Sequence, residues 1–232
     1  MMFQGFDNKA FLFLKNLKNN NSREWFAENK SMYENALREP SKLLLNEIDQ
    51  LFIKHRLPYE ASPKKSLFRI NRDTRFSKDK TPYKTNVGIT FPVHRKQDHL
   101  VHATKTEKPG MYLHIEPGAC FIAGGLYMPD GQQLKSIRER IESDWTILHE
   151  IQQQRAFKKE FPKGLLGEKL KTMPRGFDPE HPGKEYLRMK QFIVMESISD
   201  SALKSNLLIK ALLAKATAMS SLIMFLDEAI TD

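Results

Sequence analysis

The spacing of apolar residues changes twice along this chain, and the two changes limit the folds it can adopt. Up to about residue 56 apolar side chains recur every three or four residues, as on the buried side of a helix. Between residues 66 and 129 they alternate by twos, which is typical of strands, and after Pro129 the helical spacing returns. Helices, then strands, then helices predict an α+β fold.

Three helices are predicted before the first strand. Asp7 can cap the first, and Asn21 or Ser22 can cap the second, because Asn21 and Glu24 have the spacing of a capping box. Pro40 lacks a backbone N–H, so it cannot continue the second helix but suits the first turn of a third.

Five strands are predicted, and the first four lie close together in the sequence. Pro117-Gly118 is a tight-turn signal that joins the third and fourth as a hairpin, and strands joined by turns favour an antiparallel sheet. Gly124-Gly125 inside the fourth is interpreted as a bulge or a close-packing point. The predicted strands are SLFRI (66–70), NVGITFPV (86–93), MYLHIEP (111–117), ACFIAGGLYMP (119–129) and QFIVMES (191–197).

The last hundred residues return mainly to helices. Two are predicted on either side of a break near Asp144, a short one lies at 184–189, and Ser199 or Asp200 caps a final long helix. The predicted fold class is therefore α+β: a mainly antiparallel sheet of about five strands, packed with N-terminal and C-terminal helices in a single domain over residues 1–232.

Several features favour a cytoplasmic protein that does not contact a membrane. The N-terminal segment has no basic region followed by an uninterrupted apolar core, so no signal peptide is expected. The longest apolar stretch, 211–226, is too short to span a bilayer and carries Lys215. The single Cys120 excludes an internal disulfide framework and a multi-thiolate zinc site, and is interpreted as a small buried thiol.

Positive charge is concentrated in one short stretch. The chain carries 37 Lys and Arg against 28 Asp and Glu, a net charge of +9. Residues 64–84 hold eight of these basic side chains and only two Asp, so six of the nine excess charges lie there. A protein that coats nucleic acid more often spreads its basic residues over a whole face or a tail. We therefore expect a local site.

That stretch predicts an anion-binding site. Guanidinium forks match phosphate or carboxylate oxygens bidentately, and lysines add mobile point charges. In the alternative interpretation Asp73 and Asp79 pair with Arg72, Arg75 and Lys80, and the loop neutralises itself. The candidate anion-binding residues are Arg69, Arg72, Arg75, Lys78, Lys80 and Lys84, with Asp73 and Asp79 as supporting residues.

Acid–base chemistry needs a proton carrier as well. Tyr112, His114 and Glu116 stand at i, i+2 and i+4 of a predicted strand, so they share one face. If that strand neighbours the basic loop, His114 can act as general base or acid, and Tyr83 or Tyr112 can donate to a developing oxyanion. The alternative is a half-buried histidine that is hydrogen-bonded within the sheet.

No metal or cofactor is predicted. His94, His99 and His102 lie with Asp98 in a polar loop, which gives no fixed ligand geometry. The chain has no phosphate-binding Walker loop and no Gly-x-Ser-x-Gly nucleophile elbow.

Four segments together resemble a known family of bacterial and fungal conserved proteins, the domain of unknown function 2461. They are FLKNLKNNNSREWFAENKSMYE, LFRINRDTRFSKDKTPYKTNVGITF, GMYLHIEPGACFIAGGLYMPDGQQL and, more loosely, LKTMPRGFDPEHPGKEYLRMKQF. They follow in this order over nearly the whole chain. The resemblance implies one full-length domain, and it brings no activity and no catalytic residues.

Three functional hypotheses follow. The first is an anion-binding cleft for a phosphate or another anionic small molecule, in an enzyme that acts on a phosphorylated or acidic substrate. The second is a non-enzymatic nucleic-acid-binding module in which Phe76 or Tyr83 stacks on a base. The third is a structural or interaction protein with a self-neutralised basic loop. No oligomeric state is predicted.

Overall fold

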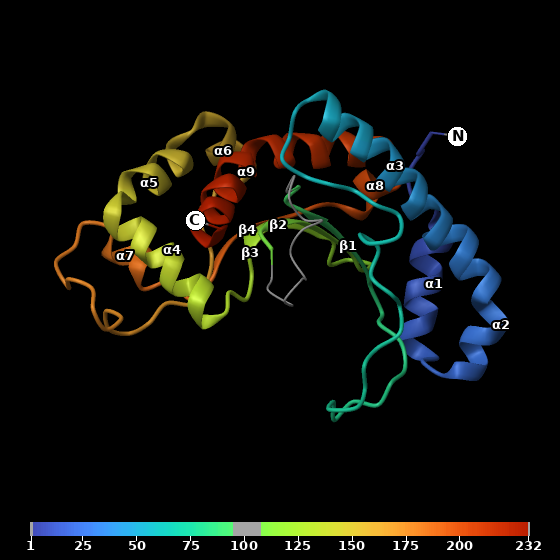
Figure 1. Cartoon of the computed structure of the whole chain (residues 1–232). Helices are drawn as coiled ribbons and strands as arrows, with labels where there is room; N and C mark the ends of the chain where they lie inside the picture. Colours follow the sequence, from blue (N-terminus) through green and yellow to red (C-terminus); the bar gives the residue numbers. More distant parts are fainter. Residues whose placement is uncertain (1, 95–107, 232) are drawn as a thin grey trace.

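The chain folds into one antiparallel sheet with helices from both ends of the sequence around it (Figure 1). This computed structural model describes residues 2–94 and 108–231. The α+β prediction is confirmed, with four strands in the described residues instead of about five. The strands are β1 (Val87–Pro92), β2 (Gly110–Ile115), β3 (Phe121–Leu126) and β4 (Phe192–Ser197). The helices are α1 (Asn8–Asn19), α2 (Arg23–Tyr33), the π-helical turn η1 (Glu34–Arg38), α3 (Glu39–Lys54), α4 (Gly131–Ser143), α5 (Trp145–Gln153), α6 (Arg155–Glu160), α7 (Lys184–Leu187), α8 (Asp200–Leu203) and α9 (Leu207–Thr231).

The segment predicted as the first strand, 66–70, contributes only an isolated bridge. Leu67 pairs with Ile89, and the Phe68 N–H donates to the Gly88 carbonyl at 3.0 Å. After that the chain leaves the sheet, because Ile70 pairs with residues of the following hairpin. The four remaining strands follow the order β1-β2-β3-β4, and each neighbouring pair is antiparallel.

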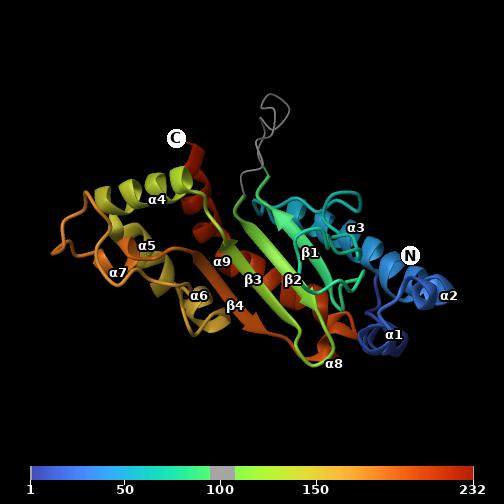
Figure 2. The ribbon, with the colours of Figure 1, turned by 90° about the horizontal axis from the view of Figure 1, so that it is seen from below.

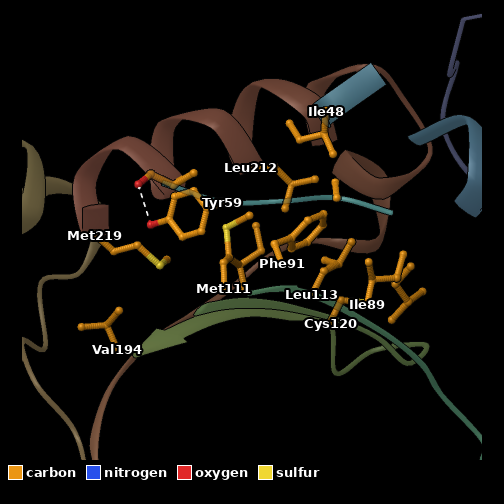
Figure 3. Packing of buried hydrophobic residues seen from close by; sticks show 14 of the residues in the cluster. Ile48, Tyr59, Ile89, Phe91, Met111, Leu113, Cys120, Val194, Leu212 and Met219 are labelled. Atoms are coloured by element: carbon orange, nitrogen blue, oxygen red, sulfur yellow. Dashed lines mark hydrogen bonds between the residues drawn. The ribbon is translucent and has the colours of Figure 1, made fainter. Parts of the chain in front are cut away.

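The two faces of the sheet have different surroundings. Seen from below, α9 lies behind the strands, and among the described residues no helix lies in front of them (Figure 2). On the covered face Phe91, Met111 and Leu113 point from the sheet toward α9 (Figure 3). A Cβ at Gly124 would lie 2.0 Å from the Met219 sulfur, so this glycine is a close-packing point, as predicted.

Helix α9 is longer than the apolar stretch predicted at 211–226. It has 25 residues, which by length and composition is enough to cross a membrane, but half of its apolar window is buried inside the structure. Tyr59 donates to the Ala216 carbonyl at 3.0 Å (Figure 3), and buried Lys215 lies 3.1 Å from Glu160. These contacts are those of the core helix of a folded protein.

The N-terminal caps follow the prediction in part. Asp7 caps α1 by accepting from the Ala10 N–H at 3.1 Å. Ser22 caps α2, whereas neighbouring Asn21 turns away and binds the backbone of Tyr83. Ser199 caps only the short α8, and α9 begins separately at Leu207.

Pro40 was expected to end the second helix and to stand in the first turn of a third. The second part is confirmed, but no break separates the helices. The chain continues from α2 through η1 into α3, with Pro40 in the first turn of α3. In an α-helix its ring would clash with the carbonyl of the residue four positions earlier. The π-helical turn before it has the wider i to i+5 spacing, in which the Glu39 N–H bonds to the Glu34 carbonyl. The wider turn gives room for the proline.

Candidate functional site

Residues 70–84 form an irregular hairpin, here called the basic hairpin, that projects beyond the body of the protein (Figure 1). Two backbone hydrogen bonds of 2.8 Å close its stem, from Arg72 to the Pro82 carbonyl and from Lys84 to the Ile70 carbonyl.

The stem is fixed to α2 through Tyr83. Its ring is buried and stacks on Phe26, with centroids 4.1 Å apart and planes 17° apart. The Asn21 side chain binds the Tyr83 backbone in both directions, donating to its carbonyl at 2.9 Å and accepting from its N–H at 3.1 Å. Tyr83 therefore has a packing contact, and its ring points to α2 instead of the face that carries Tyr112 and His114.

Beyond the stem, residues 73–81 form the tip of the basic hairpin. The Arg72 side chain reaches from the stem into this tip. Its guanidinium donates to the Asp79 carboxylate and to the Thr81 hydroxyl. The hydrogen bond from Arg72 lowers the pKa of Asp79 to about 2, so the carboxylate is ionised at neutral pH. Both side chains remain partly open to solvent.

A second pair lies beside the first. Arg75 donates to both oxygens of Asp73, at 3.0 and 2.7 Å, and this hydrogen bonding lowers the pKa of Asp73. Lys80 donates to the Thr74 carbonyl at 2.9 Å. The tip thus contains the internal ion pairs of the self-neutralised interpretation, although the paired groups stay exposed.

Four candidate cations stand outside these ion pairs: Lys80 and three others. Arg69 and Lys78 are exposed, whereas Lys84 is half-buried with its ammonium 5.3 Å from the centroid of the Phe68 ring. Burial lowers the pKa of Lys84, and the nearby positive charge of Arg69 lowers it further. Lys84 is therefore the cation that turns toward the sheet.

On the open face of the sheet, Tyr112, His114 and Glu116 lie together, as the alternation of β2 predicts. The Tyr112 hydroxyl oxygen is 3.1 Å from His114 Nδ1, and His114 Nε2 is 3.3 Å from Glu116 Oε2. Lys18 Nζ lies 3.5 Å from the other oxygen of Glu116. Burial raises the pKa of Tyr112, so its phenol is protonated at neutral pH.

Asn86 also contacts the histidine. Its amide nitrogen lies 3.3 Å from His114 Nδ1. Nδ1 thus has two polar neighbours, the Asn86 amide and the Tyr112 hydroxyl, and the tautomer of the ring decides which groups donate. With the ring proton on Nε2, the ring donates to Glu116 and Nδ1 accepts from Tyr112.

Two positions opposite His114 in the sheet shape its surroundings. Phe121 pairs with it on β3, and the two rings stack with centroids 4.6 Å apart and planes 10° apart. Gly88 pairs with it on β1, and a Cβ there would lie 2.7 Å from the Tyr112 hydroxyl. The glycine therefore makes room for the phenol beside the imidazole.

The structure brings some predicted residues together and separates others. Phe68 connects Lys84 to Tyr112, since its ring centroid lies 6.0 Å from that of Tyr112. Arg72 and Arg75 lie further along the hairpin, in their own ion pairs. The residues that gather at the stem, here called the stem site, are Lys84, Asn86, Tyr112, His114 and Glu116.

A hollow of about 480 Å³ adjoins the stem site. Phe121, Met195 and Cys120 are among its lining residues. The Cys120 thiol is buried and donates to the Glu116 carbonyl at 3.0 Å, and burial raises its pKa to about 12, so it is not a nucleophile.

A larger groove of about 690 Å³ lies elsewhere, between the end of α3, α5 and α9. Its charged lining includes Arg140, which pairs with Glu228 at 2.7 Å and lies over the Phe225 ring. No histidine is among its lining residues in the described part of the chain, and we place the candidate chemistry at the stem site because Tyr112, His114 and Glu116 lie within hydrogen-bonding distance of one another there.

The histidines of the polar loop fall mostly outside the described residues. His99 and His102 lie there together with Asp98, and described His94 is exposed, 3.7 Å from Glu60. Within residues 2–94 and 108–231, no group of three His, Cys, Asp or Glu side chains is arranged to hold a metal.

The comparisons with known proteins identify a family. The family described as "Conserved hypothetical protein (DUF2461)" matches residues 9–225. The chain belongs to this family. The match includes the basic hairpin and the stem site, and it confirms the resemblance noted from the sequence. The chain matches no curated protein and no solved structure.

Proposed function

We propose that this member of the DUF2461 family binds an anionic small molecule, such as a phosphorylated metabolite, at the stem site and exchanges a proton with it. The observation that carries the proposal is the Tyr112–His114–Glu116 relay on an uncovered sheet face, together with the half-buried ammonium of Lys84, which lies over the ring of Phe68, a neighbour of Tyr112.

Lys84 and Arg69 would supply the charge that attracts the anion. Among the candidate cations, Lys84 has lost part of its hydration to the surrounding side chains, and its attraction for an anion is therefore less screened by water. The paired arginines of the tip would add to the positive field at longer range.

The relay would move the proton. When the Tyr112 oxygen accepts a proton from a ligand O–H or C–H group, its own proton passes to His114 Nδ1. The ring becomes an imidazolium next to the Glu116 carboxylate, which stabilises the positive charge. The ligand keeps the electron pair as an anion, which Lys84 stabilises, and the reverse sequence returns the proton.

Calorimetric titration with inorganic phosphate and with glycerol phosphate tests the binding. Lys84→Gln is expected to weaken binding by about tenfold, the usual loss for a hydrogen bond to a charged group. Lys163→Gln, an exposed lysine that follows α6, is the matched control and is expected to bind like the wild type.

The NMR signals of the His114 ring, followed while glycerol phosphate is added, test the relay, because a proton passed from the ligand through Tyr112 to Nδ1 converts the ring to an imidazolium. Tyr112→Phe is expected to keep the affinity and lose this change of the ring signals. Absence of phosphate binding by the wild type, or equal affinities of Lys84→Gln and Lys163→Gln, would contradict the proposal.

A further inference from the structure

The most exposed large apolar side chain in the described residues is Phe76, at the tip of the basic hairpin. Its exposed fraction is 95%, although the core of the protein buries phenylalanines from both ends of the chain. The guanidinium carbon of the neighbouring Arg75 lies 5.7 Å from the centroid of the Phe76 ring. A ring held in water on a projecting loop does not contribute to the packing of this chain, so its contact surface is available to another molecule.

The tip holds its shape without support from the body of the protein. Arg75 is fixed flat against Asp73 by two hydrogen bonds, and the Arg75 N–H also binds Asp73 at 3.2 Å. The Thr81 N–H donates to Asp79, two residues before it, at 2.9 Å, and Lys80 reaches across the loop to the Thr74 carbonyl. An aromatic side chain on a pre-organised loop binds with a smaller loss of conformational entropy than one on a disordered loop.

The charge around the ring selects an anionic partner. Lys78 is exposed and lies two residues from Phe76, and Lys80 follows it. Asp73 and Asp79 compensate only Arg75 and Arg72, so the tip keeps an excess of positive charge.

We propose that the tip of the basic hairpin binds single-stranded nucleic acid, with Phe76 stacked on a base and Lys78 and Lys80 against the phosphates. Base stacking needs a single exposed ring, and cations at either side of it follow the backbone. An anionic membrane would need a wider apolar surface, whereas the neighbours of Phe76 at the tip are polar: Thr74, Arg75, Ser77 and Lys78. This inference is independent of the stem site.

Fluorescence anisotropy with labelled mixed-sequence oligonucleotides of about 20 nucleotides tests it, using single-stranded DNA, single-stranded RNA and duplex DNA between about 50 and 200 mM salt. Phe76→Ala is expected to weaken single-strand binding by about 5- to 150-fold, the range known for loss of one base–aromatic stack. Phe76→Trp is expected to restore it. Lys78→Gln is expected to lower the slope of log affinity against log salt by about 0.7, the effect of one phosphate contact.

Ile53→Ala is the matched control, because Ile53 is an apolar side chain with an exposed fraction of 65% on α3. It is expected to bind like the wild type. A preference for DNA or for RNA would support the inference and identify its natural ligand.

Three outcomes would overturn the inference: no binding of single strands at low salt, equal binding by Phe76→Ala and the wild type, or tighter binding of duplex than of single strands. Binding of phosphatidylserine vesicles that is lost in Phe76→Ala, without oligonucleotide binding, would assign the tip to a membrane instead. All four variants change exposed side chains, and circular dichroism verifies that each one is folded.

Discussion

The same strands carry apolar packing residues on one face of the sheet and hydrogen-bonded polar residues on the other. Toward α9, alternate residues such as Leu113 are apolar and fully buried, and Gly124 lets Met219 approach the backbone. On the other face, Tyr112 and His114 are partly exposed and are linked by hydrogen bonds. One face is built for packing density, and the other keeps polar groups that a stable core does not require.

The difference separates stability from function in a single strand. Residues of β2 alternate between the two faces, so neighbouring positions can be changed with separate consequences. We expect changes on the covered face to lower the free energy of unfolding, and changes on the open face to alter ligand and proton binding at little cost in stability. Three predictions test this contrast, and a fourth tests the exposed ion pair of the basic hairpin.

The largest effect is expected for Leu113→Ala on the covered face. Removing a fully buried leucine leaves a cavity against α9 and is expected to lower the free energy of unfolding by about 2 to 5 kcal/mol. Urea denaturation measures this change. Met195→Ala, on the partly exposed face of β4, is the control and is expected to change stability little. Equal losses for the two variants would break the comparison.

Gly88→Ala is expected to have an intermediate effect. The new methyl group would meet the Tyr112 hydroxyl at 2.7 Å and displace it from His114. The expected loss of stability is about 1 kcal/mol, at the low end for overpacking, because the tyrosine is at the open face and can move toward solvent. The NMR signals of the His114 ring report the loss of its partner. Unchanged signals would mean that Gly88 does not position the phenol.

Tyr112→Phe is expected to have a smaller effect on stability. It removes one partly exposed hydrogen bond, worth about 1 kcal/mol or less, and leaves the ring contacts in place. The same variant is expected to abolish the change of the His114 ring signals on addition of glycerol phosphate. A large loss of stability with that change intact would show that the Tyr112 hydroxyl only supports the fold.

The smallest effect is expected from acid at the hairpin tip. The folded-state pKa of Asp79 is lowered to about 2, so its contribution is complete above its ordinary pKa and is lost as the pH falls toward 2. The Arg72 side-chain NMR signals are therefore expected to change only in this acidic range. In Asp79→Asn the Arg72 signals should be independent of pH, and global stability should be almost unchanged because the pair is exposed.

Local sequence signals predicted much of the fold. The cap predicted at Asp7 and the break predicted near Asp144 mark helix boundaries, and the alternation in β2 placed Tyr112 beside His114. These features depend on residues close together in the chain, where spacing alone determines geometry.

Long-range pairing was not predictable in the same way. Segment 66–70 has the composition of a strand, yet it makes only an isolated bridge and two further backbone hydrogen bonds with β1 before Ile70 turns to Lys84, and this choice depends on competition between distant segments. Asn86 and Phe121 reach His114 only through the register of β1, β2 and β3. A shift of the register by one residue would exchange the two faces; the apolar alternation opposes such a shift, but it does not identify which residue of the neighbouring strand lies opposite His114.

The π-helical turn η1 sets an angle between distant parts of the protein. A π-helical turn corresponds to one extra residue in a helix, and each residue turns the helix by about 100°. Deleting one residue from η1 would thus rotate α2 relative to α3 and carry Phe26 away from Tyr83. The extra residue of η1 therefore keeps Phe26 in the position from which it stacks on Tyr83 at the stem of the basic hairpin.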